Sequence, residues 1–260
     1  MVETAMSSPS SPILLLFAGI LGLIFGSFAN ALITRVPTKE SLWTRSRCNH
    51  CKAQIATRDN IPVISYLLLH GKCRSCHGKI SIQYPVVEML SSLLFIFPFL
   101  IFSRWEPILF WLIISTLGIP LVVIDLRLHR LPDRLTVALF TTSLLISIGC
   151  GIIGKQSGRI LYALIGAFSL ALFYFIIALL SKGGMGMGDV KLALSIGLAS
   201  GFFSAHLVIV ATFVAFGLGS AIGLFLMATG KANRKTAIPF GPFMIVGQLI
   251  SLLLLPGQYY

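Results

Sequence analysis

The amino-acid sequence predicts an all-α polytopic membrane protein with about eight transmembrane helices and one small loop domain that contains four cysteines. Of the 260 residues, 56% are hydrophobic and only 11% are charged, a composition far outside that of soluble domains. The charges gather in tight clusters that are separated by long uncharged runs. Because about 20 apolar residues cross the hydrocarbon core as a helix, most of these runs fit one crossing each.

The uncharged runs give the expected spans in chain order. The first run has no basic region before it and no small-residue cleavage site, so we expect a retained span and not a signal peptide. The short run at 89–103 is expected to begin earlier, at Pro85, which puts Glu88 in the first turn of that helix. The run at 192–230 fits two spans with a turn at 201–204. The runs are 4–34, 89–103, 107–124, 135–154, 160–181, 192–230 and 236–260.

The distribution of lysine and arginine predicts the orientation. In an eight-span arrangement, 17 of the 20 basic residues fall on one side, in segments 34–84, 125–134, 181–191 and 229–237. By the positive-inside rule this side is cytoplasmic, and both termini face outward. The net charge of +12 is therefore explained by topology and by contact with anionic lipid. We expect the lipid bilayer as a partner and no nucleic acid.

Residues 34–84 form the one loop large enough to be a small domain, between a first span in 1–33 and a transmembrane core in 85–260. This loop contains two CxxC pairs, and their cysteines are Cys48, Cys51, Cys73 and Cys76. Two residues between thiolates let both reach one ion, and two such pairs complete a tetrahedral zinc-ribbon site. Four cysteines fill the coordination shell of Zn²⁺, so the predicted metal is structural and stabilises a loop with little core.

Two alternatives to a four-cysteine zinc site remain open from the sequence. Disulfides are the first, although the predicted orientation puts these thiols in a reducing compartment. The second is a histidine ligand in place of one cysteine, because His50, His70 and His77 lie in the same loop. We expect these histidines to be solvated.

The eight acidic residues are few enough to weigh individually. Solvated positions are expected for Glu3, Glu40 and Asp59, and an ion pair with Arg104 is expected for Glu106. The helix dipole favours Glu88 if it lies in a first turn, although an acid so near the bilayer keeps a functional role open.

Asp125 and Asp133 fall on either side of a short cytoplasmic turn. Asp125 directly follows an 18-residue uncharged run and lies at the carboxyl end of a predicted span. This is the unfavourable pole of the helix dipole, which costs about 0.3–1 kcal/mol, so another interaction should hold the carboxyl. Asp133 follows Pro132 immediately before the next run, which is the normal opening of a helix. Its expected role is structural.

The stretch "GGMGMGDVKL", residues 183–192, places Asp189 after a string of glycines. As an ordinary structural residue, Asp189 would be the N-cap of a helix that begins at Val190. A cap, however, needs no glycine string, whereas glycines let a second chain approach the backbone closely. We therefore expect Gly186 and Gly188 to leave room for an extended substrate strand. The string also includes Gly183 and Gly184.

Asp125 and Asp189 are thus expected at the same depth, on the same face of the membrane. Two carboxyls close together cannot both ionise easily, so one keeps a proton while the other stays charged. That arrangement suits peptide hydrolysis, in which the charged carboxylate takes a proton from water and the protonated carboxyl donates to the carbonyl oxygen. Structural acids at the membrane face are the alternative interpretation.

Together the motifs resemble one family, the prepilin peptidases or type IV leader peptidases, which are membrane aspartyl proteases with a GxGD motif. The resemblance extends over most of the chain. Seven segments carry it in the family's order: "GSFANALITRVP" (26–37), the two CxxC pairs, "NIPVISYLLLHGKCRSC" (60–76), "YPVVEML" (84–90), "IDLRLHRLPDRLT" (124–136), "GMGMGDVKL" (184–192) and "IPFGPF" (238–243). The family's catalytic pair falls on Asp125 and Asp189, and its "LPD" aspartate, Asp133, is carried over as structural.

The resemblance implies a bacterial inner-membrane enzyme that cleaves the basic leader of pilin or pseudopilin precursors after a glycine, on the cytoplasmic side. In this family such substrates belong to type IV pilus, type II secretion or competence systems, and the sequence does not distinguish among them. Many members also methylate the new N-terminal residue with S-adenosylmethionine, an activity that the family associates with the cysteine loop and with a Gly-Lys pair, here Gly71 and Lys72. The chain departs from the family pattern at Ala29 and Asn49, neither of which is a catalytic position.

Two functions from other classes compete with the protease. An ion-coupled transporter would use its intramembrane acids to bind ions, but those acids should lie near the bilayer midplane and not at its boundary. A membrane-anchored zinc-ribbon adaptor without chemistry would tolerate replacement of both aspartates.

Overall fold

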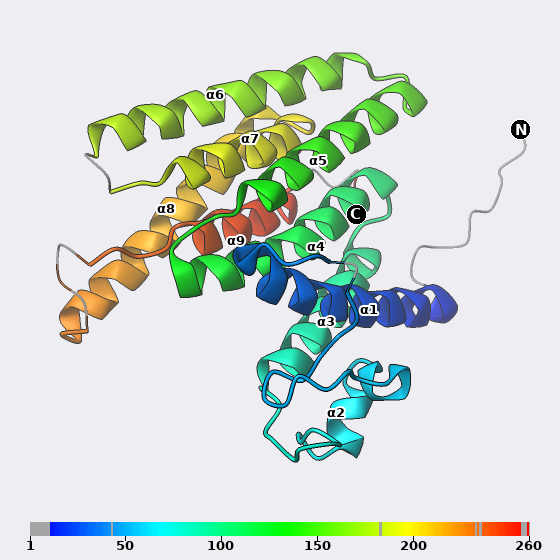
Figure 1. The fold of residues 1–260 in the computed structure, drawn as a ribbon. Helices are drawn as coiled ribbons and strands as arrows, with labels where there is room; N and C mark the ends of the chain where they lie inside the picture. The colour runs from blue at the N-terminus through cyan, green and yellow to red at the C-terminus, as the bar shows by residue number, and fades with distance from the viewer. Residues whose placement is uncertain are drawn as a thin grey trace, which may run out of the picture. The chain divides into compact units, whose positions relative to one another are not determined.

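The computed structural model describes residues 11–42, 44–181, 184–231, 233, 236–255 and 259 (Figure 1). It divides into two compact units, Met1–Ser103 and Arg104–Tyr260. Within the described residues, β pairing is limited to two isolated bridges in the cysteine loop, and the rest of the ordered secondary structure is helical. The predicted all-α architecture with a small four-cysteine loop is confirmed.

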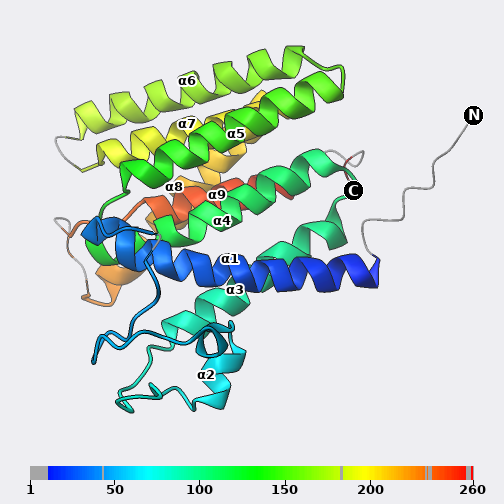
Figure 2. The same cartoon turned by 45° about the vertical axis from the view of Figure 1, so that its right-hand side comes forward.

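The N-terminal unit is built on two long helices, α1 (Pro12–Thr38) and α3 (Gln83–Ile101), which pack against each other (Figure 2). A GxxxG pair on α1 allows this close packing, because a Cβ at Gly22 or Gly26 would lie only 2.6 Å from a backbone Cα of α3. The cysteine loop between the two helices contains a short 3₁₀ turn, η1 (Thr57–Asn60), and one short helix, α2 (Ile64–Leu68). The compact unit thus includes α3, which the sequence analysis placed with the transmembrane core.

The start of α3 corrects the expectation for Glu88. The helix begins at Gln83, two residues before Pro85, so Glu88 lies in its second turn and not its first. Proline is tolerated in the first turn because its missing N–H would have no intrahelical partner there, and the helix therefore extends past it. The dipole of the first turn does not explain this buried acid.

The described residues of the C-terminal unit form six helices, whose bounds are α4 (Trp105–Leu128), α5 (Asp133–Ile153), α6 (Gly158–Leu180), α7 (Met187–Gly201), α8 (Ala205–Ala228) and α9 (Gly241–Leu252). The helix α7 contacts α5, α6, α8 and α9, and 11 of its 15 residues are buried. Glycines bring α6 and α7 together, since a Cβ at Gly197 would overlap the carbonyl of Gly166. The predicted turn at 201–204 is confirmed by the ends of α7 and α8.

In the part of the chain that the structure describes, eight apolar helices occupy the eight predicted spans, but they are not equally long. Six of them, α1, α3, α4, α5, α6 and α8, are long and apolar enough to cross a membrane. The other two, α7 and α9, have 15 and 12 residues, which at about 1.5 Å per residue is shorter than a 30 Å hydrocarbon core. The first of these short helices carries Asp189, and the second begins at Gly241, whose backbone N–H bonds Asp125.

Candidate active site and cysteine cluster

Asp125 lies in the last turn of α4, as predicted, and is only 5% exposed. A hydrogen bond from another helix compensates for the unfavourable position of this carboxyl at the carboxyl end of α4. The backbone N–H of Gly241, the first residue of α9, donates to Asp125 Oδ2 over 3.0 Å. The positive end of the α9 dipole therefore faces a carboxyl at the negative end of α4.

Asp189 is the third residue of α7 and is 8% exposed. The alternative interpretation of Asp189 as the N-cap of a helix at Val190 is therefore excluded, because α7 already begins at Met187. The backbone N–H of Gly186, which precedes the helix, donates to Asp189 Oδ2 over 3.1 Å. Asp189 thus closes the first turn from inside the helix, an arrangement that leaves its carboxyl at the favourable pole.

The fold brings Gly188, which precedes Asp189, and Gly241, the hydrogen-bond partner of Asp125, against one common side chain. Leu131, in the turn after α4, joins the three segments involved. A Cβ at Gly188 would lie 2.9 Å from Leu131 Cβ, and a Cβ at Gly241 would lie 3.0 Å from Leu131 Cδ2 and 2.8 Å from Asp125 Oδ2. The end of α4 and the starts of α7 and α9 therefore converge on one buried acidic site.

The glycines of the 183–192 stretch have different surroundings. Gly188 permits the close approach of Leu131, whereas a Cβ at Gly186 would make only ordinary contact with Asp189 Oδ2, at 3.5 Å. A role of Gly186 and Gly188 in admitting a substrate strand remains a prediction. Gly183 lies outside the described residues.

Two other acids have the structural roles expected for them. Asp133 is the first residue of α5 and forms a 2.6 Å ion pair with Lys191, and both side chains are largely exposed. Glu106 pairs with Arg104 at 3.9 Å. Neither acid is buried as the carboxyl pair is.

The four cysteines of the N-terminal unit form one cluster. The Sγ atoms of Cys48, Cys51, Cys73 and Cys76 all lie within 4.8 Å of one another, and the Sγ atoms of Cys48 and Cys76 are 3.9 Å apart. Tetrahedral ligands at the Zn–S distance of about 2.3 Å are separated by about 3.8 Å. The residues therefore fit a metal ion with four thiolate ligands.

Each CxxC pair lies in a knuckle of the same construction. The β-bridge between Arg47 and Gln54 closes the first knuckle, and the bridge between Lys72 and Lys79 closes the second. In each knuckle the residue after the second cysteine, Lys52 or His77, has a positive φ, and its N–H donates to the carbonyl of the first cysteine. A zinc ribbon is built from two such knuckles, each of which contributes two sulfurs to one cluster.

Backbone donors favour the thiolate form at one of these ligands. The N–H groups of Cys51 and His50 lower the pKa of the Cys48 thiol to about 6, against the opposing effect of burial. Thiolates are the form that binds metal, so this knuckle is prepared for a cation near neutral pH.

Gly71 and Lys72, the Gly-Lys pair, have different structural roles. Gly71 has a φ of +68°, which strains other residues, and a Cβ there would lie 3.0 Å from the Tyr66 hydroxyl. Lys72 takes part in the bridge that closes the second knuckle. The backbone of Gly71 thus allows the Tyr66 ring to lie against it, a contact that the Gly-Lys motif alone does not reveal.

The sequence analysis missed Gly241 as a residue of the acidic site. Its only sequence signal is the "IPFGPF" segment, in which Gly-Pro opens a short apolar helix. Nothing in that segment indicates a partner 116 positions away.

The fold and site define a polytopic helical membrane protein with two buried carboxyls at helix ends that converge on Leu131, and with a separate four-cysteine loop. Residues 20–102 match the bacterial peptidase A24 N-terminal domain, and residues 109–227 match the type IV leader peptidase family. The two matches fall within the two compact units. The chain belongs to the type IV leader peptidase family.

Curated relatives extend the similarity over nearly the whole chain. The Prepilin leader peptidase/N-methyltransferase of Pectobacterium carotovorum subsp. carotovorum is 33% identical over 265 residues, which cover 91% of each chain. The protein of that name from Neisseria gonorrhoeae is 35% identical, over 91% of this chain and 89% of its own. The one from Stutzerimonas stutzeri is 32% identical, over 97% of this chain and 94% of its own. No solved structure matches.

Proposed function

We propose that the chain is a bacterial inner-membrane enzyme that removes the leader peptide of pilin or pseudopilin precursors and methylates the new N-terminus. Asp125 and Asp189 are its catalytic residues. The observation that supports the peptidase most is the burial of these two carboxyls at the junction of α4, α7 and α9, each with one backbone N–H donor. Family membership and the names of the relatives support both activities.

The geometry suits general acid–base hydrolysis. A water between the carboxyls loses a proton to the charged aspartate as it attacks the peptide carbonyl, while the protonated aspartate donates to the carbonyl oxygen. The N–H groups of Gly241 and Gly186 each bond one carboxyl oxygen and so fix its direction. The placement of both acids at helix ends favours a site at the membrane boundary over an ion path at the midplane.

The cysteine cluster is proposed to hold a structural Zn²⁺, because four cysteines leave no open coordination position for catalysis. For methylation, S-adenosylmethionine would supply an activated methyl group on a sulfonium ion. The protein's part is to bind that cation and to bring the new amino terminus to it. We also propose an orientation in which both termini face outward and both sites face the cytoplasm. The distribution of lysine and arginine supports this orientation.

The proposed function is tested with the zinc-loaded chain reconstituted in lipid, a pilin precursor and S-adenosylmethionine. Mass spectrometry should find a mature pilin that lacks its leader and carries one added methyl group. An intact precursor after long incubation would refute the peptidase, and a cleaved but unmethylated product would refute the second activity.

Gly241→Ala should lower leader cleavage without unfolding the protein. Its Cβ would enter the space of Asp125 Oδ2 and Leu131, so the carboxyl must move by a fraction of an ångström. A misplacement of about 1 Å in a catalytic group can cost about 100-fold in rate, and we expect a loss of about 10- to 100-fold. The measurement is kcat/KM for precursor cleavage.

Gly149→Ala is the matched control, because Gly149 lies in α5 with nothing within 4 Å of an added Cβ. Alanine should leave cleavage unchanged there and, as the better helix former, should not lower stability. Equal activity of the two variants would show that space at Gly241 is irrelevant to the chemistry.

A further inference from the structure

A cavity of about 850 Å³ lies within the N-terminal unit, and its lining includes neither Asp125 nor Asp189. Residues of α1, the cysteine loop and α3 line it, and they include Asn30, Val63, Tyr66 and Glu88. Its volume is within the usual range of about 300–1,000 Å³ for small-molecule sites. The peptidase chemistry proposed above does not use this cavity.

Glu88 supplies a buried carboxyl to the cavity wall. The residue is 6% exposed, and its Oε2 accepts the backbone N–H of Val63 over 2.8 Å. Among the described residues, no lysine, arginine or histidine forms an ion pair with it. A buried carboxylate without a cation is costly, so a bound cation beside Glu88 would be stabilised.

The backbone that Glu88 holds is strained. Val63 has a φ of +60°, a conformation that is an outlier for a β-branched residue and costs about 1–3 kcal/mol. The hydrogen bond to Glu88 and the network before it maintain this conformation. Strain of this kind is concentrated at ligand-binding positions, and Val63 lines the cavity.

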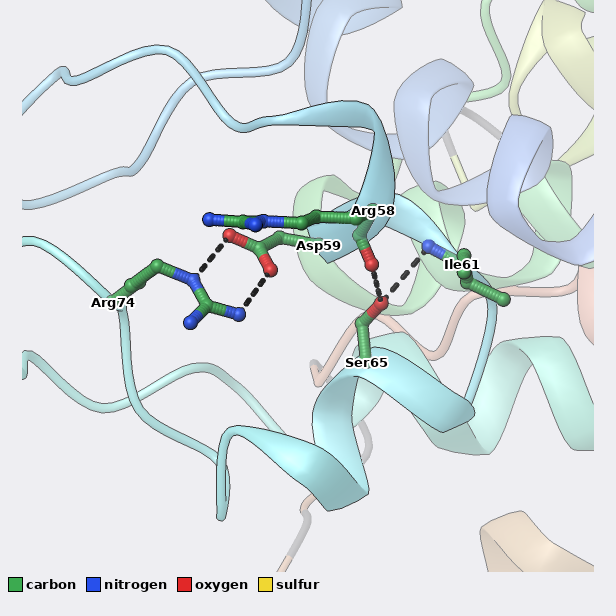
Figure 3. A network of polar contacts seen from close by, with 5 residues as sticks. All are labelled: Arg58, Asp59, Ile61, Ser65 and Arg74. Atoms are coloured by element: carbon green, nitrogen blue, oxygen red, sulfur yellow. Dashed lines mark hydrogen bonds and ion pairs between the residues drawn. The ribbon is translucent and has the colours of Figure 1, made fainter.

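A polar network links Ile61 and Ser65, which flank Val63 in the sequence, to the preceding turn (Figure 3). The Ser65 hydroxyl donates to the Arg58 carbonyl and accepts the N–H of Ile61, both at 3.0 Å. Arg74 binds both carboxylate oxygens of Asp59, at 2.6 and 2.8 Å, and this bidentate bond lowers the pKa of Asp59. The expectation that Asp59 is merely solvated is therefore wrong, because the loop folds Arg74 onto it.

The charges of the cavity are mixed, with an excess of positive charge. Its lining contains three acids and six lysine or arginine side chains, namely Arg35, Arg45, Arg47, Lys52, Arg74 and Lys79. Arg74 neutralises Asp59, and Glu40 is exposed, which leaves Glu88 as the buried acid of the lining. A ligand that matches the cavity carries a cationic centre for Glu88 and an anionic group for the basic side chains.

Tyr66 adds a flat aromatic surface to the wall. Its ring lies against Gly71, whose missing Cβ would otherwise contact the Tyr66 hydroxyl at 3.0 Å and Cζ at 3.1 Å. Aromatic side chains bind nucleobases by stacking. Gly71 is thus a positioning residue for Tyr66. This explains how a glycine outside the cavity lining affects the cavity.

We propose that this cavity binds S-adenosylmethionine, with its sulfonium beside Glu88 and its adenine against Tyr66. The proposal rests on the methyltransferase activity proposed above. The methyl donor combines a fixed cation, a carboxylate and an adenine, and so matches Glu88, the basic side chains and Tyr66 together. A basic leader peptide would match Glu88 but is repelled by the six cations, and a phosphate group would match the cations but not Glu88.

The test compares the binding of S-adenosylmethionine and S-adenosylhomocysteine to the full zinc-loaded chain in lipid nanodiscs. The two ligands differ by the methyl group and the positive charge of the sulfonium. Glu88→Gln should weaken S-adenosylmethionine by about tenfold and S-adenosylhomocysteine by less than about threefold, because only the first carries the cation. Tyr66→Ala should weaken both by about tenfold, through lost stacking.

Leader cleavage and zinc content, measured on the same samples, show that each variant is folded. Glu106→Gln, in the C-terminal unit, is the control and should bind both ligands as the unmodified chain does. Equal weakening of the two ligands by Glu88→Gln, or unchanged affinity in both variants, would overturn the proposal. A chain that cleaves precursor but does not bind the donor overturns only this proposal, whereas a chain that binds the donor but leaves precursor intact overturns the peptidase.

Discussion

Asp125→Asn and Asp189→Asn should each abolish leader cleavage, with a loss of about 10²- to 10⁴-fold in kcat/KM. Asparagine keeps the oxygen that accepts the N–H of Gly241 or Gly186, so the packing of α4, α7 and α9 is preserved. What is removed is the ionisable group, without which neither proton transfer in the proposed mechanism can occur. Mass spectrometry of a pilin precursor measures the remaining cleavage.

Asp133→Asn is the matched control for both variants. Asp133 opens α5, directly after the turn that follows α4, but it is exposed and pairs with Lys191. Loss of an exposed ion pair costs at most about 1 kcal/mol, so cleavage should continue at nearly the normal rate. If either catalytic variant cleaves within about tenfold of the unmodified chain, the assignment of the pair is refuted.

The position of Asp125 shows how far local reasoning from the sequence extends. A carboxyl at the end of an apolar run predicted both its place in the last turn of α4 and the need for a compensating partner, and the structure confirms both. The partner could not be predicted, because Gly241 is 116 positions away and its N–H is one of several free donors at any helix start. Local patterns predict what a residue requires, and only the tertiary fold decides what satisfies it.

In the N-terminal unit, the sequence predicted the cysteine cluster but not the partners of the acidic residues. Cysteine spacing predicted the cluster, because two knuckles around one ion follow from the CxxC pattern alone. The acids of that unit were interpreted less well. Glu88 and Asp59 acquire their partners, Val63 and Arg74, from turns whose conformation the sequence does not specify, including a positive φ at a valine.

The chemistry proposed for the two compact units is separable in sequence. The carboxyl pair and the helices that hold it all belong to residues 104–260, whereas the cysteine cluster and the cavity belong to residues 1–103. Damage to one unit should therefore affect one activity more than the other.

Serine at the four cysteines should release the proposed Zn²⁺ and remove methylation while leaving most of the leader cleavage. Structural zinc contributes about 10–16 kcal/mol of binding free energy to small domains of this type, so the knuckles unfold without it. Cys48 and Cys73 line the cavity, whose wall would be lost with them. The carboxyl pair lies in the other unit and keeps its own hydrogen bonds.

Zinc content, methyl transfer to a pre-cleaved pilin and precursor cleavage are measured on the same preparation. Cys150→Ser is the control, because Cys150 lies in α5, outside the cluster, and should affect none of the three. Since a metal-free loop cannot keep Glu88, Val63 and Tyr66 in one wall, binding of S-adenosylmethionine should disappear together with methylation. A metal-free variant that methylates at the normal rate would show that the cysteine loop does not build the methyl-transfer site.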